Sequence, residues 1–211
     1  MEFTRNCHTP PPTPYREGSS VSLWSPSPFG GDISLLSEVE IGKTVRIYRE
    51  YIECRFNTYK ASEECDRDKL VQDFAQKADY VNVLGLLKLT KASPPSFCLA
   101  YRVAESVEGI LTGSVVEENI HVGCLITAPW NLRMVAPNIE GKTATPGIGR
   151  ALMQAAYGRA QEVGAPKVCL SPLRGSVEFY RKIGMEEDET TGEMAFPVTE
   201  ALPPLLFPPP F

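Results

Sequence analysis

The sequence predicts a mixed α/β (α+β) fold in which a mostly antiparallel central sheet is flanked by helices in three layers. Three observations predict it. Apolar, β-branched segments separated by turn residues fill positions 97–127, which is typical of paired antiparallel strands. Residues 145–187 then supply a glycine turn, an amphipathic helix, a short apolar strand and a second short helix ending at a glycine. Strands followed by helix, strand, helix and a last strand indicate helices packed on the faces of one sheet.

The composition sets the size of the fold and argues against several classes of partner. With 211 residues, of which 43% are apolar, the chain has room for one domain with a sizeable core. Its formal net charge of −5 argues against a nucleic-acid partner, which needs a basic face. No run of about eighteen apolar residues is present, so no membrane span or membrane partner is expected.

The cysteine and histidine content argues against a metal site. Six cysteines are scattered without a Cys-x-x-Cys pair, and only two histidines are present, so we expect no bound metal. Reduced thiols and a cytoplasmic location fit this pattern best, because the N-terminus has no secretory h-region.

Three segments are expected along the chain. Residues 1–31 are rich in proline, serine and glycine and should form an extended arm, in which Val21-Ser22-Leu23-Trp24 is a candidate edge strand. Residues 32–198 should form the single folded domain. Residues 199–211 form a proline-rich, irregular tail, because proline removes backbone donors.

The first half of the domain is the least clear. Residues 44–60 have the β-branched and aromatic content of a strand, but Tyr48, Ile52 and Phe56 also recur at helical spacing, and we favour a helix for the middle of this segment. A second helix is expected from Asp66, with an apolar stripe formed by Leu70, Val71, Phe74 and Ala78. The pair Pro94-Pro95 must stop any helix before it.

Three strands are expected next. Residues 97–103 and 109–116 should pair around a charged turn, and 120–127 should follow after the turn Glu117-Glu118-Asn119. A long loop from Ala128 to Pro146 then leads to the glycine turn.

The glycine turn Gly147-Ile148-Gly149 is the strongest functional signal. Glycine allows the backbone to approach a ligand closely, and the helix that follows, from about Arg150 to Val163, offers unpaired N–H donors and a positive end to an anion. A nucleotide-hydrolase phosphate loop would need Lys-Ser or Lys-Thr where Arg150-Ala151 stands. A dinucleotide fingerprint would need a third glycine where Leu152 stands. The simpler alternative is a helix N-terminus packed in a core.

With Phe179-Tyr180-Arg181-Lys182-Ile183-Gly184-Met185 downstream, the chain resembles the GNAT superfamily of acyl-CoA-dependent N-acetyltransferases. The resemblance covers roughly residues 97–196 and is sharpest over 126–185. The segment Ala128-Pro129-Trp130-Asn131 also looks like a bacterial GNAT subgroup with an Ala-Pro-Trp-Asn loop.

The resemblance implies a cofactor site. The strand before the glycine loop is expected to splay from its neighbour and to bind the pantothenate arm of acetyl-CoA by its main chain, here at Leu125, Ile126 and Thr127. The pyrophosphate is expected on the backbone of Gly147, Ile148, Gly149, Arg150 and Ala151. One departure weakens this grip: Ala144 stands where the family usually has Arg or Gln.

The resemblance also implies a catalytic residue. Tyr180 is expected near the thioester sulfur, where its phenol would protonate the departing thiolate as general acid; the alternative is a core role, which we favour for Phe179. Val122 or Gly123 takes the position where the family often carries a carboxylate base. The nearest titratable candidates are Glu117, Glu118 and His121, and none is assigned.

Two functions follow from these expectations. The first is transfer of an acetyl (acyl) group from acetyl-CoA to an amine, on a small molecule or a protein, by direct attack in a ternary complex of a monomeric or homodimeric enzyme. A cysteine acyl-enzyme is disfavoured because no cysteine has both a His and an Asp nearby in sequence. The second is a catalytically weak or inactive GNAT-fold module that binds acyl-CoA and has a regulatory role.

Trp130 and Asn131 would frame an acceptor pocket or close the loop over the core.

Overall fold

A computed structural model describes residues 31–61, 81, 97–131, 145–173 and 175–199 of the chain, with residues 55–61 described by their backbone only. The predicted strand at Val21–Trp24, the helix from Asp66 and the stop at Pro94-Pro95 lie outside these residues. Most of the predicted arm and tail lies outside them too.

The described strands form one mixed sheet, as the sequence predicts. Its order is β1-β2-β3-β4-β5-β7-β6. Every neighbouring pair is antiparallel except β4 and β5, which run parallel. The strands are β1 (Asp32–Leu35), β2 (Phe97–Val103), β3 (Ser106–Val116), β4 (Asn119–Thr127), β5 (Lys167–Leu170), β6 (Glu186–Glu187) and β7 (Met194–Pro197).

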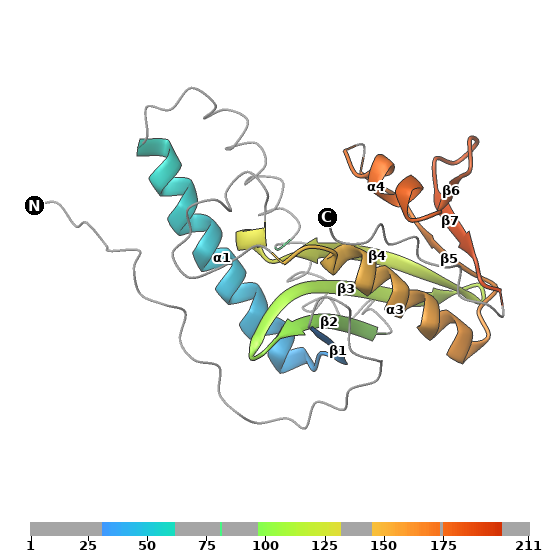
Figure 1. The fold of residues 1–211 in the computed structure, drawn as a ribbon, viewed down its shortest axis with the longest axis horizontal. Coiled ribbons are helices and arrows are strands. Elements are labelled where there is room, and N and C mark those ends of the chain that lie inside the picture. The colour runs from blue at the N-terminus through green and yellow to red at the C-terminus, as the bar shows by residue number, and fades with distance from the viewer. Residues whose placement is uncertain (1–30, 62–80, 82–96, 132–144, 174, 200–211) are drawn as a thin grey trace, which may run out of the picture.

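Helices cover the two faces of this sheet (Figure 1). The long α1 (Glu38–Ala61) lies on one face, and α3 (Ile148–Val163) runs across β2, β3 and β4 on the other. The short α4 (Val177–Lys182) connects β5 to β6, and the 3-10 turn η1 (Pro129–Asn131) follows β4. The three predicted layers are therefore confirmed.

Helix α1 confirms the helical interpretation of residues 44–60 and begins earlier than expected. Ser37 and Glu40 cap its N-terminus reciprocally: the Ser37 N–H donates to Glu40 Oε2 at 2.9 Å and the Glu40 N–H donates to Ser37 Oγ at 3.3 Å. This is a capping box, which satisfies donors that a helix start leaves unpaired. Further along, Ile41, Val45, Tyr48 and Ile52 are buried, so the helical period decides the packing.

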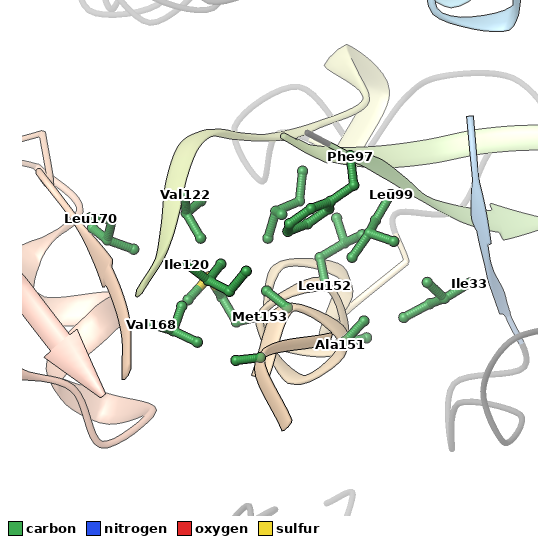
Figure 2. Close-up of a cluster of buried hydrophobic side chains, with 14 of the residues drawn as sticks. Ile33, Phe97, Leu99, Ile120, Val122, Ala151, Leu152, Met153, Val168 and Leu170 are labelled. Carbon is green, nitrogen blue, oxygen red and sulfur yellow. The ribbon is translucent and has the colours of Figure 1, made fainter. Parts of the chain in front are cut away.

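Two apolar cores lie on opposite faces of the sheet because alternate strand residues point to opposite sides. Against α3 lie Leu99, Leu111, Ile120 and Val122, and Figure 2 shows the side chains of Leu152 and Met153 reaching from α3 toward these strands. Against α1 lie Cys98, Ala100, Ile110, Cys124 and Ile126. These cores fix the position of β4, which the cleft described below depends on.

Two details of the hairpins differ from the sequence-based expectation. The charged turn between β2 and β3 is shorter than expected, because β3 begins at Ser106 and so includes Glu108. At the second turn, Glu117 and Glu118 both have positive φ, 48° and 68°, as the two central residues of a tight hairpin turn require.

The described cysteines are not all reduced, in contrast to the expectation. Cys98, Cys124 and Cys169 are free thiols, and all three are buried, whereas Cys54 is disulfide-bonded. Among the described helices, none is long and apolar enough to cross a membrane.

Candidate active site

The central feature of the site is the divergence of β4 from β5. These parallel strands are paired only at Ile120–Val168 and His121–Cys169, although β4 continues to Thr127. A cleft of about 390 Å³ opens beyond the paired end. Its lining comes from β4, from the chain after β5 and from α4, and consists of Val122, Gly123, Cys124, Leu125, Leu170, Ser171, Leu173, Gly175, Ser176 and Tyr180.

A β-bulge shapes β4 inside the cleft. Thr112 pairs with Cys124 and Gly113 pairs with Val122, so Gly123 is the extra residue. Gly123 is exposed, and a Cβ at this position would meet only Thr112 Oγ1, at 3.4 Å. That hydroxyl is buried and makes no hydrogen bond within the described part of the chain. A side chain at position 123 would therefore meet little of the surrounding chain.

The backbone of β4 turns two of the three predicted cofactor residues, Leu125 and Thr127, away from β3, and Leu125 lines the cleft. The Ala128 N–H donates to the Glu108 carbonyl at 2.7 Å, so Ala128 faces β3. Because antiparallel hydrogen bonds alternate along a strand, the peptide groups of Leu125 and Thr127 face the side from which β5 has diverged. The peptide of Ile126 faces β3, and its side chain packs in the core under α1.

The predicted glycine turn forms the N-terminus of α3. Gly147 is the N-cap, with φ 78° and no side-chain cap, a left-handed conformation that favours glycine. Its carbonyl accepts from the Ala151 N–H at 2.9 Å, so the N–H groups of Ile148 and Gly149 lie before the first hydrogen bond of the helix. Ile148 and Ala151 are buried and Arg150 is half-buried.

Packing brings this turn beside the cleft. A Cβ on Gly149 would lie 3.9 Å from Leu125 Cδ2 and 3.1 Å from the ring of Phe179. Glycine at 149 therefore also serves close packing against α4, and the helix start is at once a packed core element and a neighbour of the cleft.

Tyr180 is 7% exposed and lines the cleft from α4. The neighbouring ring of Phe179 meets it edge-on, with centroids 5.0 Å apart. Phe179 packs against the core beside α3, in the structural role expected for it.

The candidate bases lie elsewhere. Glu117 and Glu118 are exposed at their turn, and neither lines the cleft. His121 Nε2 lies 3.2 Å from Cys169 Sγ on the neighbouring strand, so one cysteine does have a histidine partner, which the local sequence did not show. Burial raises the pKa of the Cys169 thiol, Lys167 lowers it and Glu193 raises it; the net shift is upward, which disfavours the thiolate.

The cysteine in the cleft is a poor nucleophile. Burial raises the pKa of Cys124 to about 12, and burial together with Cys124 raises the pKa of Cys98 to about 12. Both thiols are therefore protonated near neutral pH. Among the described residues, no group of three or more metal-binding side chains is present.

A buried carboxylate is the feature that the sequence analysis missed. Glu108, 6% exposed, accepts hydrogen bonds at its Oε2 from Trp130 Nε1 at 2.5 Å and from Asn131 Nδ2 at 2.7 Å. Glu108 is distant in sequence from both donors, and only the adjacency of β3 with the end of β4 brings them together. Trp130 and Asn131 thus close the loop after β4, one of the two roles considered for them.

The mostly antiparallel sheet, the divergence of β4 from β5 and the glycine turn beside the cleft agree with the architecture that the sequence analysis expects. No protein-family model matches the sequence, and no curated protein matches it either.

Three solved acetyltransferase structures resemble the chain. The PaiA N-acetyltransferase from Thermoplasma acidophilum, in complex with coenzyme A, has a TM-score of 0.48 and 14% identity, with 79% of this chain and 98% of that chain covered. Ard1 from Thermoplasma volcanium has a TM-score of 0.45 and 19% identity, with 81% of this chain and 99% of that chain covered. A GNAT family acetyltransferase from Brucella melitensis, in complex with acetyl-CoA, has a TM-score of 0.45 and 13% identity, with 81% of this chain and 90% of that chain covered.

Proposed function

We propose that the protein is an N-acyltransferase that transfers an acetyl group from acetyl-CoA to an amine by direct attack in a ternary complex. The observation that carries this proposal is the cleft between β4 and β5, which has the β4 backbone on one side, Tyr180 on the other and the N-terminus of α3 beside it. Main-chain groups of Leu125 and Thr127 would bind the pantothenate arm. The first turn of α3, from Gly147 to Ala151, would bind the pyrophosphate.

Direct attack is favoured over a cysteine acyl-enzyme by the state of the thiols. Cys124 is protonated because burial raises its pKa to about 12, and its side chain packs under α1. Tyr180 would protonate the departing thiolate. Holding the amine and the thioester together in one cleft would lower the activation barrier through proximity.

A second candidate function is acyl-CoA binding without turnover. One observation favours it: the residues that line the cleft in the described part of the chain include no carboxylate and no imidazole. An amine acceptor is mostly protonated near neutral pH, so transfer needs a group or a water molecule that removes its proton.

The Ala128–Asn131 segment supports placing the chain near the bacterial subgroup that it resembles.

Titration calorimetry with acetyl-CoA, followed by an assay of CoA release with a panel of amines, tests both functions. The panel would contain spermidine, an aminoglycoside, a lysine peptide and a peptide with a free α-amino group. Binding with turnover supports the enzyme, and binding without turnover supports the module. If acetyl-CoA does not bind, both are wrong.

A matched pair of variants tests the location of the cofactor site. Gly149→Ala and Gly149→Asp both add a Cβ beside Phe179, but only aspartate adds a negative charge where the pyrophosphate is proposed. We expect the aspartate variant to lose acetyl-CoA binding and the alanine variant to retain most of it. Equal affinity in the two folded variants would contradict the assignment of the glycine turn.

A further inference from the structure

The buried carboxylate of Glu108 fixes the orientation of a neighbouring amide. A carboxylate only accepts hydrogen bonds, so the Asn131 group that faces Glu108 Oε2 at 2.7 Å must be its NH₂. The amide oxygen of Asn131 is thereby directed away from Glu108. It accepts from the Thr145 N–H at 2.9 Å.

These contacts form a bracket across the connection between β4 and α3. We define the Glu108 bracket as Glu108, Trp130, Asn131 and Thr145. It ties β3 and the end of β4 to a residue that lies two positions before Gly147. Its members Asn131 and Thr145 flank the stretch 132–144 in the sequence.

The surroundings of the bracket are well packed. On α1, the rings of Tyr48 and Tyr51 meet Trp130 edge-on, with centroids 5.5 Å and 5.4 Å away. The Tyr48 hydroxyl donates to the Val107 carbonyl at 2.8 Å. A buried carboxylate is costly unless its hydrogen bonds are made, and the two donors to Glu108 Oε2 are the neutral side chains of Trp130 and Asn131. The side chains of Trp130 and Asn131 therefore cannot turn away without leaving the buried Glu108 carboxylate short of hydrogen bonds.

We propose that Glu108 is a positioning residue of the acyl-CoA site: through Asn131 and Thr145 it holds the glycine turn so that the first-turn N–H groups of α3 point at the pyrophosphate. This inference rests on the proposed function. It assigns Glu108 no contact with the cofactor.

Asn131→Asp is the decisive variant. It replaces the donor that faces Glu108 with a second carboxylate, and two adjacent carboxylates repel unless they share a proton. We expect acetyl-CoA affinity to fall by roughly tenfold or more at pH 8, the range for removing a buried hydrogen bond. As the pH falls toward 5, a shared proton restores a hydrogen bond between the two carboxyls, so the affinity of the variant should recover relative to wild type.

The other ionisable groups around Glu108 do not produce this recovery. Tyr48 on α1 has a pKa raised well above its usual value by burial and then by the charge of Glu108, against a lowering effect of Arg102. It stays neutral throughout this range. Arg102 on β2 pairs with Glu40 at 2.7 Å. Tyr51, the other phenol that faces Trp130, is half-buried on α1.

Two further variants complete the experiment. Adding Glu108→Gln to Asn131→Asp gives the introduced carboxylate an amide donor and leaves Trp130 an acceptor, so the double variant should regain affinity at pH 8. Asn131→Ala removes the bracket without repulsion, so it should lose affinity equally at every pH. The alanine variant decides the matter if the aspartate variant does not fold.

The measurement is calorimetric titration with acetyl-CoA between pH 5 and 8, with the melting temperature recorded for each variant. Wild-type affinity in folded Asn131→Asp or Asn131→Ala would overturn the inference, and so would a loss in the aspartate variant that neither low pH nor Glu108→Gln relieves. If wild-type protein itself fails to bind acetyl-CoA, the proposed function is wrong and the inference falls with it. Normal wild-type binding with unaffected variants sinks the inference alone.

Discussion

At the scale of single residues, Tyr180 joins packing and chemistry in one side chain. Its ring packs in the core beside α3 while the residue lines the cleft, and the buried ring is what would hold the phenol in place. The two roles separate in a variant that keeps the ring and removes the oxygen.

Tyr180→Phe should lower turnover by roughly ten- to a thousandfold, within the usual contribution of a general acid. Acetyl-CoA affinity and melting temperature should change little, because the apolar ring remains. The measurements are steady-state kinetics on an amine that wild type acetylates, calorimetry and thermal melting. Phe179→Leu is the matched control, expected to lower stability more than chemistry. Normal turnover in Tyr180→Phe would make Tyr180 a core residue only.

At the scale of elements, α3 begins and ends at glycines in the left-handed region. Gly147 at the N-cap has φ 78° and Gly164 at the C-cap has φ 70°. The two ends share a backbone requirement, but only the first lies at the proposed anion site. Equivalent substitutions at the two ends therefore separate an effect on helix stability from an effect on the proposed anion site.

Gly147→Ala and Gly164→Ala should each cost about 1–2 kcal/mol, the usual penalty for a side chain in the left-handed region. Only Gly147→Ala should also weaken acetyl-CoA binding, because it disturbs the first turn of the helix. Denaturant unfolding gives the first quantity and calorimetry the second. If both variants weakened binding equally, the effect would belong to the stability of the helix and not to a site at its start.

The start of α1 is tied to the sheet through Glu40. Burial raises the pKa of this carboxyl, but hydrogen bonds from Ser37 and the charge and hydrogen bond of Arg102 outweigh burial, so the pKa is lowered from 4.5. A carboxyl whose folded pKa is depressed stabilises the protein above its unfolded pKa. That stabilisation is lost as the pH falls through the folded value.

Glu40→Gln should therefore lower the melting temperature at pH 7, and the difference from wild type should shrink as the pH falls below about 4.5, the reference value for the carboxyl. Thermal melts between pH 3 and 7 measure this. Glu50→Gln is the control, because Glu50 is exposed and lies 3.9 Å from Arg46, a pair expected to contribute little. A pH-independent difference for Glu40→Gln would show that the carboxylate charge is not involved.

At the scale of the whole molecule, the reactivity of Cys98 and Cys124 reports how often the folded core opens to solvent. They are buried on neighbouring parts of the sheet under α1, and their raised pKa values, about 12, keep them protonated. A thiol reagent can reach them only when this packing opens.

Iodoacetamide at pH 8 should therefore modify Cys98 and Cys124 at a common rate, which mass spectrometry of peptides can follow. That rate should match global opening and should fall when acetyl-CoA is added, because a ligand that binds the folded state reduces the open population. Denatured protein, modified quickly at both sites, is the control. Fast modification of Cys124 alone would show that the cleft exposes its thiol.

How far the sequence predicts the molecule depends on how local each signal is. The strands from 97 to 127, the glycine turn and α3 follow from periodicity within short windows, and the structure confirms them. The start of α1 has a local signal too, because Ser37 and Glu40 have capping-box spacing. Strand β1, four residues long, carries too little pattern to be recognised.

The candidate site is less local. The divergence of β4 from β5, the bulge at Gly123 and the approach of His121 to Cys169 arise from register between distant strands. The sequence analysis places Glu108 in a charged turn because the expected strand begins only at Gly109, and no short-range rule connects Glu108 to Asn131. Site residues that depend on strand pairing therefore emerge only from the structure.

The turns of the two hairpins bear on the order of folding. Ala104 has φ 51°, and Glu117 and Glu118 have φ 48° and 68°, so each turn requires a left-handed conformation from residues other than glycine, at a local cost. A turn of Asn-Gly would close such a hairpin spontaneously, whereas these turns resist closure until the strands hold them. We therefore expect closure of the β2–β3 and β3–β4 hairpins to depend on pairing between the strands and on their packing against α3, and not on the turns themselves.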